Sequence, residues 1–349
     1  MKPKIQIKSY KKTAKQYYKI KNYRKAAQAY TQVIENNPAR AKLYYKRAKC
    51  YSMLWWNRKA LNDLNTCVKI DPKYYKAHSL LGYVYTEKKE YHLAELHLDS
   101  CMKLNADYPA MYKFLAYLAF EKNDCQEAID YLSKGLVLKP RKPLFYDFKG
   151  FLHEQIDENE IALDYYIKAI ELKPTYKRAH LHMAELLVDM GRLSEALQVY
   201  DQLLVFYPDN DAVYMDKATV YKTLSLQEKA IECYNKAIQV NKKNADAYFK
   251  RSELWLLKEN TKKALEDLDS CLYIKPNYPG VYYNRGLIYL KEKNYHNALY
   301  DLGQAIKKNE RPADAYYHRS LIYKELGQVV KAIEDYHKAH KLDPESYKL

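Results

Sequence analysis

The chain has 349 residues, of which 29% are charged, and its formal net charge at pH 7 is +16. No stretch approaches the apolar length that spans a bilayer, and the basic start MKPKIQIKSYKK lacks the apolar core of a signal peptide. The six cysteines show neither the paired spacing of zinc ligands nor that of redox motifs. These features argue against a membrane-spanning or disulfide-stabilised secreted protein and favour a reducing compartment, the cytoplasm.

A 34-residue period runs through the sequence. Alanine recurs at this interval from Ala26 to Ala332, a second column of small residues runs from Ala14 to Ser320, and tyrosine or histidine recurs from Tyr10 to Tyr316. Proline closes seven of the ten units. Such regularity indicates one structural unit that is repeated ten times.

Each unit is predicted to be a helical hairpin. Apolar residues recur at helical spacing in two runs, which are separated by a short polar turn and closed by the proline position. The turn needs a residue that adopts the left-handed conformation. The residues expected to supply it are Gly191 and Gly327, with Asn22, Asn123, Asn260 and Asn294 at other turns.

The pattern of small, aromatic and proline positions resembles the tetratricopeptide repeat (TPR) family over residues 7–346. The resemblance implies an all-α fold: an α-solenoid that forms a right-handed superhelix of antiparallel helix hairpins. The first helix of each hairpin would line a concave groove. A single solenoid is expected between a short basic lead at residues 1–6 and a C-terminal end at residues 347–349, because no linker interrupts the period. The predicted repeats are 7–40, 41–74, 75–108, 109–142, 143–176, 177–210, 211–244, 245–278, 279–312 and 313–346.

The positive charge is concentrated in the first two repeats. Residues 1–72 hold 18 Lys and Arg against 3 Asp and Glu, whereas the remainder holds 41 against 40. Such a one-sided field is expected to attract an acidic partner segment, although a lysine-rich cap that only improves solubility is the alternative. The predicted groove lysines are Lys8, Lys11, Lys12, Lys15, Lys42, Lys46, Lys49 and Lys76.

Two adjacent tryptophans, Trp55 and Trp56, lie at the turn of the second repeat, where glycine, asparagine or a charged residue is usual. Both cannot face the same helix interface. At least one is therefore a candidate exposed anchor for a partner, and packing under the neighbouring turn is the alternative.

Beyond the basic end, the predicted groove positions become apolar. Acidic residues interrupt them at Asp147, Glu154, Glu185, Asp189 and Asp216. Such an order suits an extended or helical peptide with complementary segments, unless tight curvature buries these side chains instead. The predicted apolar groove residues are Leu80, Tyr83, Phe114, Tyr117, Phe120, Phe148, Phe151, Phe249, Tyr283 and Tyr317.

A non-enzymatic scaffold or adaptor is the predicted function. It would hold segments of partner proteins within a larger assembly. No phosphate-binding loop, nucleophile elbow or metalloprotease motif occurs, so no catalytic residue, cofactor or metal is expected. The last helix would leave a stacking face open, which a partner or a second copy is expected to cover.

Three alternatives remain for the basic end. Lysines interleaved with tyrosines suit RNA, and the same lysines suit an acidic cytoskeletal surface such as a tubulin tail, which would place the protein at the cytoskeleton or cilium. TPR co-chaperones grip the tail of a heat-shock chaperone with a carboxylate clamp. Lys11 and Lys76 fit the clamp pattern, but Lys15 and Lys46 replace its asparagines and Leu80 replaces its arginine.

Overall fold

The computed structural model describes residues 2–348, and it describes side chains from Ser9 onward. Across this part of the chain all regular structure is helical, and no strand occurs. The chain forms two compact units, residues 1–186 and 187–349, and each is described by itself. The boundary between them falls inside one helix, α11 (Lys177–Asp189).

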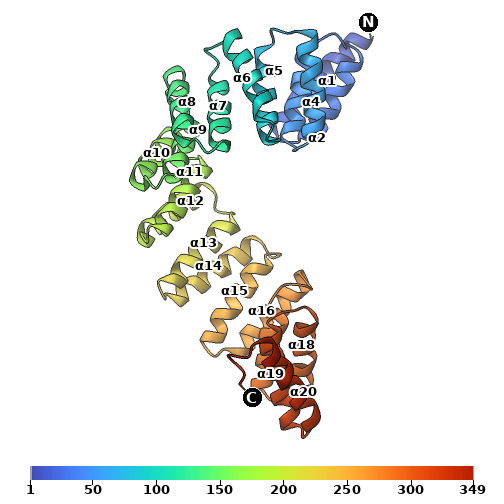
Figure 1. The fold of residues 1–349 in the computed structure, drawn as a ribbon, viewed down its shortest axis with the longest axis vertical. Helices are drawn as coiled ribbons and strands as arrows, with labels where there is room; N and C mark the ends of the chain where they lie inside the picture. The colour runs from blue at the N-terminus through green and yellow to red at the C-terminus, as the bar shows by residue number, and fades with distance from the viewer. Residues whose placement is uncertain (1, 349) are drawn as a thin grey trace. The chain divides into compact units, whose positions relative to one another are not determined.

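Each predicted repeat contains two helices (Figure 1). In unit 1, the helices before α11 are α1 (Lys2–Lys19), α2 (Tyr23–Glu35), α3 (Ala41–Ser52), α4 (Asn57–Ile70), α5 (Tyr75–Glu87), α6 (Tyr91–Leu104), α7 (Pro109–Glu121), α8 (Cys125–Leu138), α9 (Pro143–Glu154) and α10 (Asn159–Leu172). In unit 2 they are α12 (Leu193–Phe206), α13 (Asp211–Thr223), α14 (Gln227–Val240), α15 (Ala245–Leu257), α16 (Thr261–Ile274), α17 (Val281–Lys291), α18 (Tyr295–Lys307), α19 (Pro312–Glu325) and α20 (Val329–Leu342).

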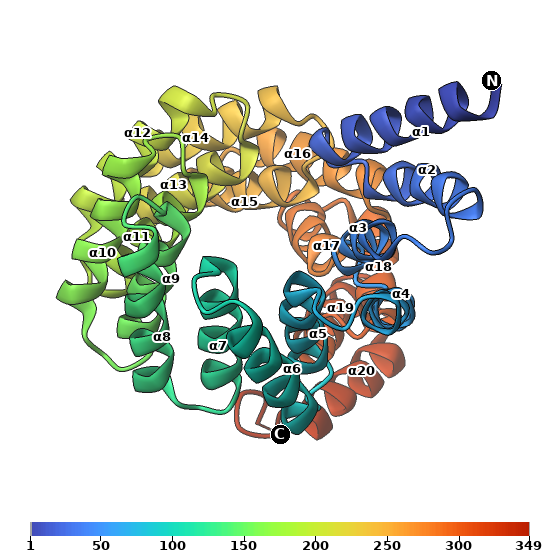
Figure 2. The ribbon, with the colours of Figure 1, turned by 90° about the horizontal axis from the view of Figure 1, so that it is seen from above.

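The predicted all-α solenoid of helix hairpins is confirmed. Within unit 1, Figure 2 shows α7 and α9 on the inner side of the curve and α8 and α10 on the outer side. One detail of the prediction differs, since α1 begins at Lys2 and residues 2–6 of the expected lead are helical. Pro3 is compatible with this early start because proline fits the first turn of a helix. A single continuous solenoid over all ten hairpins stays a prediction.

The small-residue columns lie in the core. The alanines of the first column are fully buried from Ala26 to Ala298, and glycine is required at some positions of the second. A Cβ on Gly150 would lie 2.6 Å from the ring of Tyr166. The small residues therefore let the two helices of a hairpin approach closely, as the sequence pattern predicts.

The turn inside each hairpin contains one residue with positive φ, again once every 34 residues. Gly191 and Gly327 have φ of 73° and 72°, and Asn123 has φ of 64°, as predicted. The prediction for Asn22, Asn260 and Asn294 is wrong. Each of these asparagines is the N-cap of the following helix and accepts a hydrogen bond there, while Lys21, Glu259 and Lys293 take the left-handed conformation. Asparagine is among the most favourable N-cap residues, and at these three turns it caps the helix and does not adopt the left-handed conformation.

Four hairpins also contain a buried arginine–aspartate pair that links their two helices. In each pair the guanidinium donates two hydrogen bonds to the carboxylate sixteen residues later. The aspartates are between 1% and 5% exposed. The arginine and the aspartate recur at the same two repeat positions in all four hairpins, so the sequence period contains this signal. The pairs are Arg47–Asp63, Arg251–Asp267, Arg285–Asp301 and Arg319–Asp335.

Three of these arginines also reach the preceding hairpin through Nη1. Arg47 donates to the Thr31 hydroxyl at 2.9 Å. In the same way, Arg251 donates to Asn235 at 2.5 Å and Arg285 to Asp269 at 2.6 Å. Each guanidinium therefore joins three helices.

Candidate functional site

The first helices of unit 1 carry three pockets that share lining residues. The pocket nearest the N-terminus has a volume of about 260 Å³. It shares Tyr45 and Lys49 with a middle pocket of about 320 Å³. The middle pocket shares Tyr83, Lys113 and Phe114 with a third pocket of about 440 Å³. We call this continuous depression, which runs across α1, α3, α5, α7, α9 and α11, the unit 1 groove.

Lysines dominate the N-terminal pocket, which we call the lysine pocket. It is lined by Lys15, Tyr18, Lys19, Tyr30, Tyr45, Lys46 and Lys49. Burial and the neighbouring lysines Lys15, Lys42, Lys11 and Lys49 lower the pKa of Lys46. The ammonium groups therefore repel one another, and an anion bound among them would relieve this repulsion.

Most of the predicted basic residues lie on or beside this pocket. Burial, then Arg40, Lys15 and Lys42, lowers the pKa of Lys11, which places it in the same cluster. Lys12 and Lys42 are exposed, and Lys76 lines the middle pocket. The predicted Lys8 lies in α1, but its side chain is outside the described part of the protein.

Aromatic rings form the walls of the third pocket, which we call the aromatic pocket. The ring of Tyr83 lies 5.1 Å from that of Phe114 and 5.8 Å from that of Tyr117. On the far wall, the Phe120 ring lies 5.3 Å from that of Phe151 and 6.5 Å from that of Phe148. Six of the ten predicted apolar residues therefore meet at one place. The full lining is Trp55, Tyr83, Glu87, Lys113, Phe114, Tyr117, Phe120, Leu144, Phe148, Phe151, Arg178 and His182.

The two tryptophans have different environments. Trp55 is 68% exposed, has φ of 59° and lines the aromatic pocket. Trp56 is half-buried, with its ring 5.9 Å from that of Tyr51 and 4.6 Å from Lys59 Nζ. The positive φ of Trp55 belongs to the repeat, since every hairpin has such a residue at this turn position, so exposure and the place beside the pocket distinguish Trp55. Trp55 is thus the better candidate anchor, whereas Trp56 belongs to the packing around the turn.

Asp147 was expected to present an acidic group to the groove, but the structure does not place it there. This carboxylate is fully buried. It accepts a hydrogen bond from Arg178 Nε at 2.6 Å and lies 3.0 Å from His182 Nδ1. The Arg178 guanidinium therefore compensates the charge of Asp147, and Arg178 and His182 line the groove in its place. Glu154 is likewise engaged, since it accepts a hydrogen bond from the Tyr166 hydroxyl at 2.7 Å.

Two predicted groove residues are buried. Leu80 in unit 1 is only 7% exposed, although it borders the middle pocket. In unit 2, Tyr283 is 3% exposed and belongs to a core cluster with Leu302. Both positions follow the inner face of a first helix, but a neighbouring hairpin covers them, which is the alternative given above for the apolar stretches.

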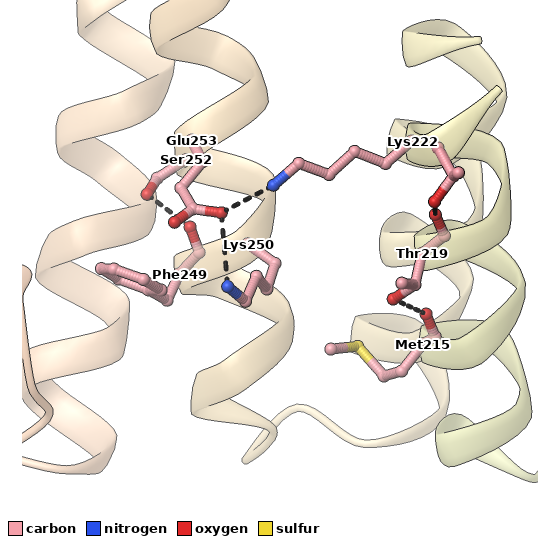
Figure 3. A network of polar contacts seen from close by, with 8 residues as sticks. Met215, Thr219, Lys222, Phe249, Lys250, Ser252 and Glu253 are labelled. Carbon is pink, nitrogen blue, oxygen red and sulfur yellow. Dashed lines mark hydrogen bonds and ion pairs between the residues drawn. The ribbon is translucent and has the colours of Figure 1, made fainter. Parts of the chain in front are cut away.

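The remaining apolar predictions in unit 2 meet other parts of that unit. The Phe249 ring packs 5.0 Å from that of Tyr278, and the Tyr317 ring is stacked on Tyr347 at 4.7 Å. Beside Phe249, Glu253 Oε2 lies 3.2 Å from Lys222 Nζ and 3.5 Å from Lys250 Nζ (Figure 3). These two lysines are paired with a carboxylate, whereas no ion pair occurs among the described lysines that line the lysine pocket.

Four polar residues of the aromatic pocket were missed by the sequence analysis: Glu87, Lys113, Arg178 and His182. The period contained the signal for three of them. Arg178 occupies the repeat position of Lys42, Lys113 that of Lys11, and His182 that of Lys12.

Repeated helix hairpins with an open groove define a helical-repeat scaffold for protein interactions. Models described as tetratricopeptide repeat match residues 12–52, 159–218, 279–310 and 313–346, and one described as TPR repeat matches residues 227–254. The chain therefore belongs to the tetratricopeptide repeat family, whose members are in general non-enzymatic scaffolds.

Similarity to curated proteins is confined to short segments. Over 62 residues the chain is 39% identical to Hsp70-Hsp90 organizing protein 1 of Glycine max, which covers 18% of this chain and 11% of that protein. Over 68 residues it is 29% identical to stress-induced-phosphoprotein 1 of Caenorhabditis elegans, which covers 20% of this chain and 21% of that protein. The match thus spans only a small part of either relative.

Among solved structures, the crystal structure of the APC/C hetero-tetramer Cut9-Hcn1 matches with a TM-score of 0.50 and 15% identity. The match covers 76% of this chain and 52% of that chain, and it shows the fold alone. Within the described residues, the helices are too short or too polar to cross a membrane.

Proposed function

We propose that the unit 1 groove binds an extended segment of a partner protein that carries acidic residues beside an apolar anchor. The observation that supports this most directly is the sharing of lining residues, which joins the lysine pocket to the aromatic pocket without a break. The chain would hold such segments within a larger assembly.

The charges of the groove favour an acidic segment. Its lining includes Lys15, Lys46, Lys49, Lys76, Lys113 and Arg178, against the single carboxylate of Glu87. That carboxylate is engaged by the pocket itself. Burial and a hydrogen bond with Glu87 raise the pKa of both Tyr83 and Tyr117. An acidic ligand would therefore meet cations along the groove, and this complementarity sets the encounter rate and the direction of binding.

The aromatic pocket favours an apolar anchor. Its volume of about 440 Å³ accepts a large side chain, and full burial of one such side chain contributes roughly 1.5–3 kcal/mol. Anchors of this kind commonly dominate peptide affinity.

A direct test uses fluorescent peptides that carry a run of glutamates, a Gly/Ser spacer of varied length and one phenylalanine. Fluorescence anisotropy should show binding of such a peptide to the full chain. Versions with lysine in place of glutamate, or with serine in place of phenylalanine, should bind more weakly. Equal binding of all three versions would contradict the proposal.

The lysines are expected to act on association. Changing Lys15, Lys46 and Lys49 to glutamate should slow association of the acidic peptide about tenfold at low salt and flatten its salt dependence. Stopped-flow mixing at several salt concentrations measures both effects. The matched control changes the exposed lysines Lys236, Lys242 and Lys262 of unit 2, and it should retain the wild-type rate. An unchanged rate in the groove variant would exclude the steering role.

The aromatic residues are expected to act on dissociation instead. Phe114→Ala together with Phe148→Ala should raise the dissociation rate of the same peptide about tenfold or more, because the anchor loses the walls of its pocket. Surface plasmon resonance measures the residence time. Tyr273→Ala is the control, since Tyr273 is 91% exposed in unit 2. Circular dichroism must show that the double variant keeps its helices, and a folded variant with wild-type residence time would refute the anchor role.

The competing partners predicted for the basic end have distinct signatures in these assays. RNA would bind through the lysines alone, with affinity that is insensitive to Phe114→Ala and Phe148→Ala. Base stacking on Tyr45 is opposed by its own packing, since its ring lies 5.3 Å from that of Tyr74. A tubulin-like acidic tail would also bind without the apolar anchor. A clamped chaperone tail would require a free C-terminal carboxylate, so blocking it as an amide would abolish binding.

The outer face of α20 remains open in unit 2. Val330 is 71% exposed and Ile333 is 53% exposed. The last described residues fold back onto α20, where the Tyr336 hydroxyl donates a hydrogen bond to the Lys348 carbonyl at 2.5 Å. Coverage of the outer face by a partner or a second copy stays part of the proposal.

A further inference from the structure

Lys113 stands where three pockets of unit 1 meet. Its side chain projects from α7 and lines both the middle pocket and the aromatic pocket. It also lines a pocket of about 270 Å³ that includes Lys139 and Lys142. The ammonium nitrogen lies 4.0 Å from the centre of the Phe114 ring and 5.8 Å from that of Tyr83. Any segment that passes from the lysine pocket to the aromatic pocket therefore passes Lys113.

The surroundings of Lys113 are rich in positive charge. Lys49 comes from α3, Lys76 from α5, Lys142 from the turn before α9 and Arg178 from α11. Glu87 of α5 lines the aromatic pocket beside Tyr83 and Tyr117, and Asp147 of α9 is paired with Arg178 and His182 of α11. Among the described side chains, no carboxylate forms an ion pair with Lys113.

We propose that Lys113 is the specificity-determining cation of the groove, which pairs with one anionic group of the partner next to its apolar anchor. This inference rests on the proposed function and adds a position to it. The anionic group is a carboxylate of aspartate or glutamate, or a phosphate on a neighbouring residue. Either group would take the place beside Lys113 that the protein's own carboxylates leave open, and it would gain strength from the aromatic, partly dehydrated surroundings.

The free protein already shows the cost of leaving this amine without a partner. Burial, and after it the positive charges of Arg178, Lys142 and Lys49, together lower the pKa of Lys113 to about 8. A bound anion favours the charged amine and raises that pKa. Above about pH 8 the protein would therefore take up a proton when the segment binds. Affinity should be full below this pH and should fall as the pH rises toward the pKa of Lys113 in the complex.

The test pairs a change in the protein with a change in the peptide. The probes are the acidic peptide described above, with glutamate, glutamine or phosphoserine beside the phenylalanine. The proteins are the full wild-type chain, Lys113→Gln and the control Lys134→Gln, whose lysine is exposed on α8 outside the groove. Dissociation constants are measured at constant ionic strength between pH 7 and about pH 9.5, a range that brackets the free pKa of Lys113.

Wild type and Lys134→Gln should bind the glutamate probe about tenfold more tightly than the glutamine probe, and this preference should weaken as the pH rises above 8. Lys113→Gln should bind both probes equally, with no pH dependence of their ratio. A stronger preference for phosphoserine would identify phosphate as the anion.

Equal affinity of wild type for all three probes would overturn the role of Lys113 while leaving the groove proposal intact. A preference that persists in Lys113→Gln would also overturn it, because another cation would then be responsible. Failure of wild type to bind any of the probes would overturn both proposals.

Discussion

Replacing Arg285 with methionine is expected to lower the free energy of unfolding by about 3–5 kcal/mol. The reason lies in the partner that the substitution leaves behind. Asp301 is 1% exposed, and its two oxygens accept hydrogen bonds from Arg285 at 2.7 and 2.8 Å. Methionine fills much of the space but leaves a buried carboxylate without its cation. Urea unfolding followed by circular dichroism, together with hydrogen exchange in α17 and α18, measures the loss.

Two controls separate the buried charge from general disturbance. Asp269 is the other carboxylate on Arg285, and its side chain is 56% exposed. Asp269→Ala should therefore cost at most about 1 kcal/mol. Arg285→Met combined with Asp301→Leu removes both charges and should recover most of the lost stability. A single variant as stable as the wild type would show that the pair contributes nothing.

Gly150→Ala is expected to destabilise unit 1, because overpacking costs about 1–3 kcal/mol. The higher helix propensity of alanine offsets up to about 1 kcal/mol of this cost. The new methyl group would lie 2.6 and 2.7 Å from two ring carbons of Tyr166 and 3.1 Å from the Ala162 carbonyl. Tyr166 is fully buried, and its hydroxyl is bonded to Glu154, so the ring cannot turn aside cheaply. Urea unfolding again provides the measurement.

Gly286→Ala is the matched comparison at the same repeat position. A Cβ at this position would lie 3.1 and 3.2 Å from two side-chain carbons of Leu302. The next nearest atom is Asp301 Cβ, at 3.4 Å. A flexible leucine yields more easily than a locked tyrosine, so this variant should be close to neutral. Equal losses at the two positions would contradict the role assigned to the locked ring of Tyr166, and a gain of stability at both would show that helix propensity dominates.

The repeat architecture was predictable from sequence because the same physical demand recurs ten times. Small residues at Ala60 or Ala128 are meaningful only as members of a column, and ten agreeing units outweigh local exceptions. The turn asparagines show the limit of this reasoning. Asn22 suits both a left-handed turn and an N-cap, and only the position of the helix start decides between them.

The groove was predictable as a set of columns, but its chemistry was not. Phe114 and Phe148 were identified because they face inward at known repeat positions. The burial of Asp147 was missed because its partners Arg178 and His182 come from the next hairpin, and Arg178 lies 31 residues later in the chain. Pairing between hairpins depends on rotamers and distances that a one-dimensional pattern does not contain.

The arginine that joins three helices has a consequence for how this array can change in length. At Arg251 and Arg285 the third hydrogen bond requires an acceptor on the preceding hairpin, Asn235 and Asp269 respectively. A hairpin inserted at one of these junctions would preserve this hydrogen bond only if it has an acceptor at the repeat position that Asn235 and Asp269 share. Hairpins three and four have leucine at the arginine position, so duplication or deletion there faces no such requirement.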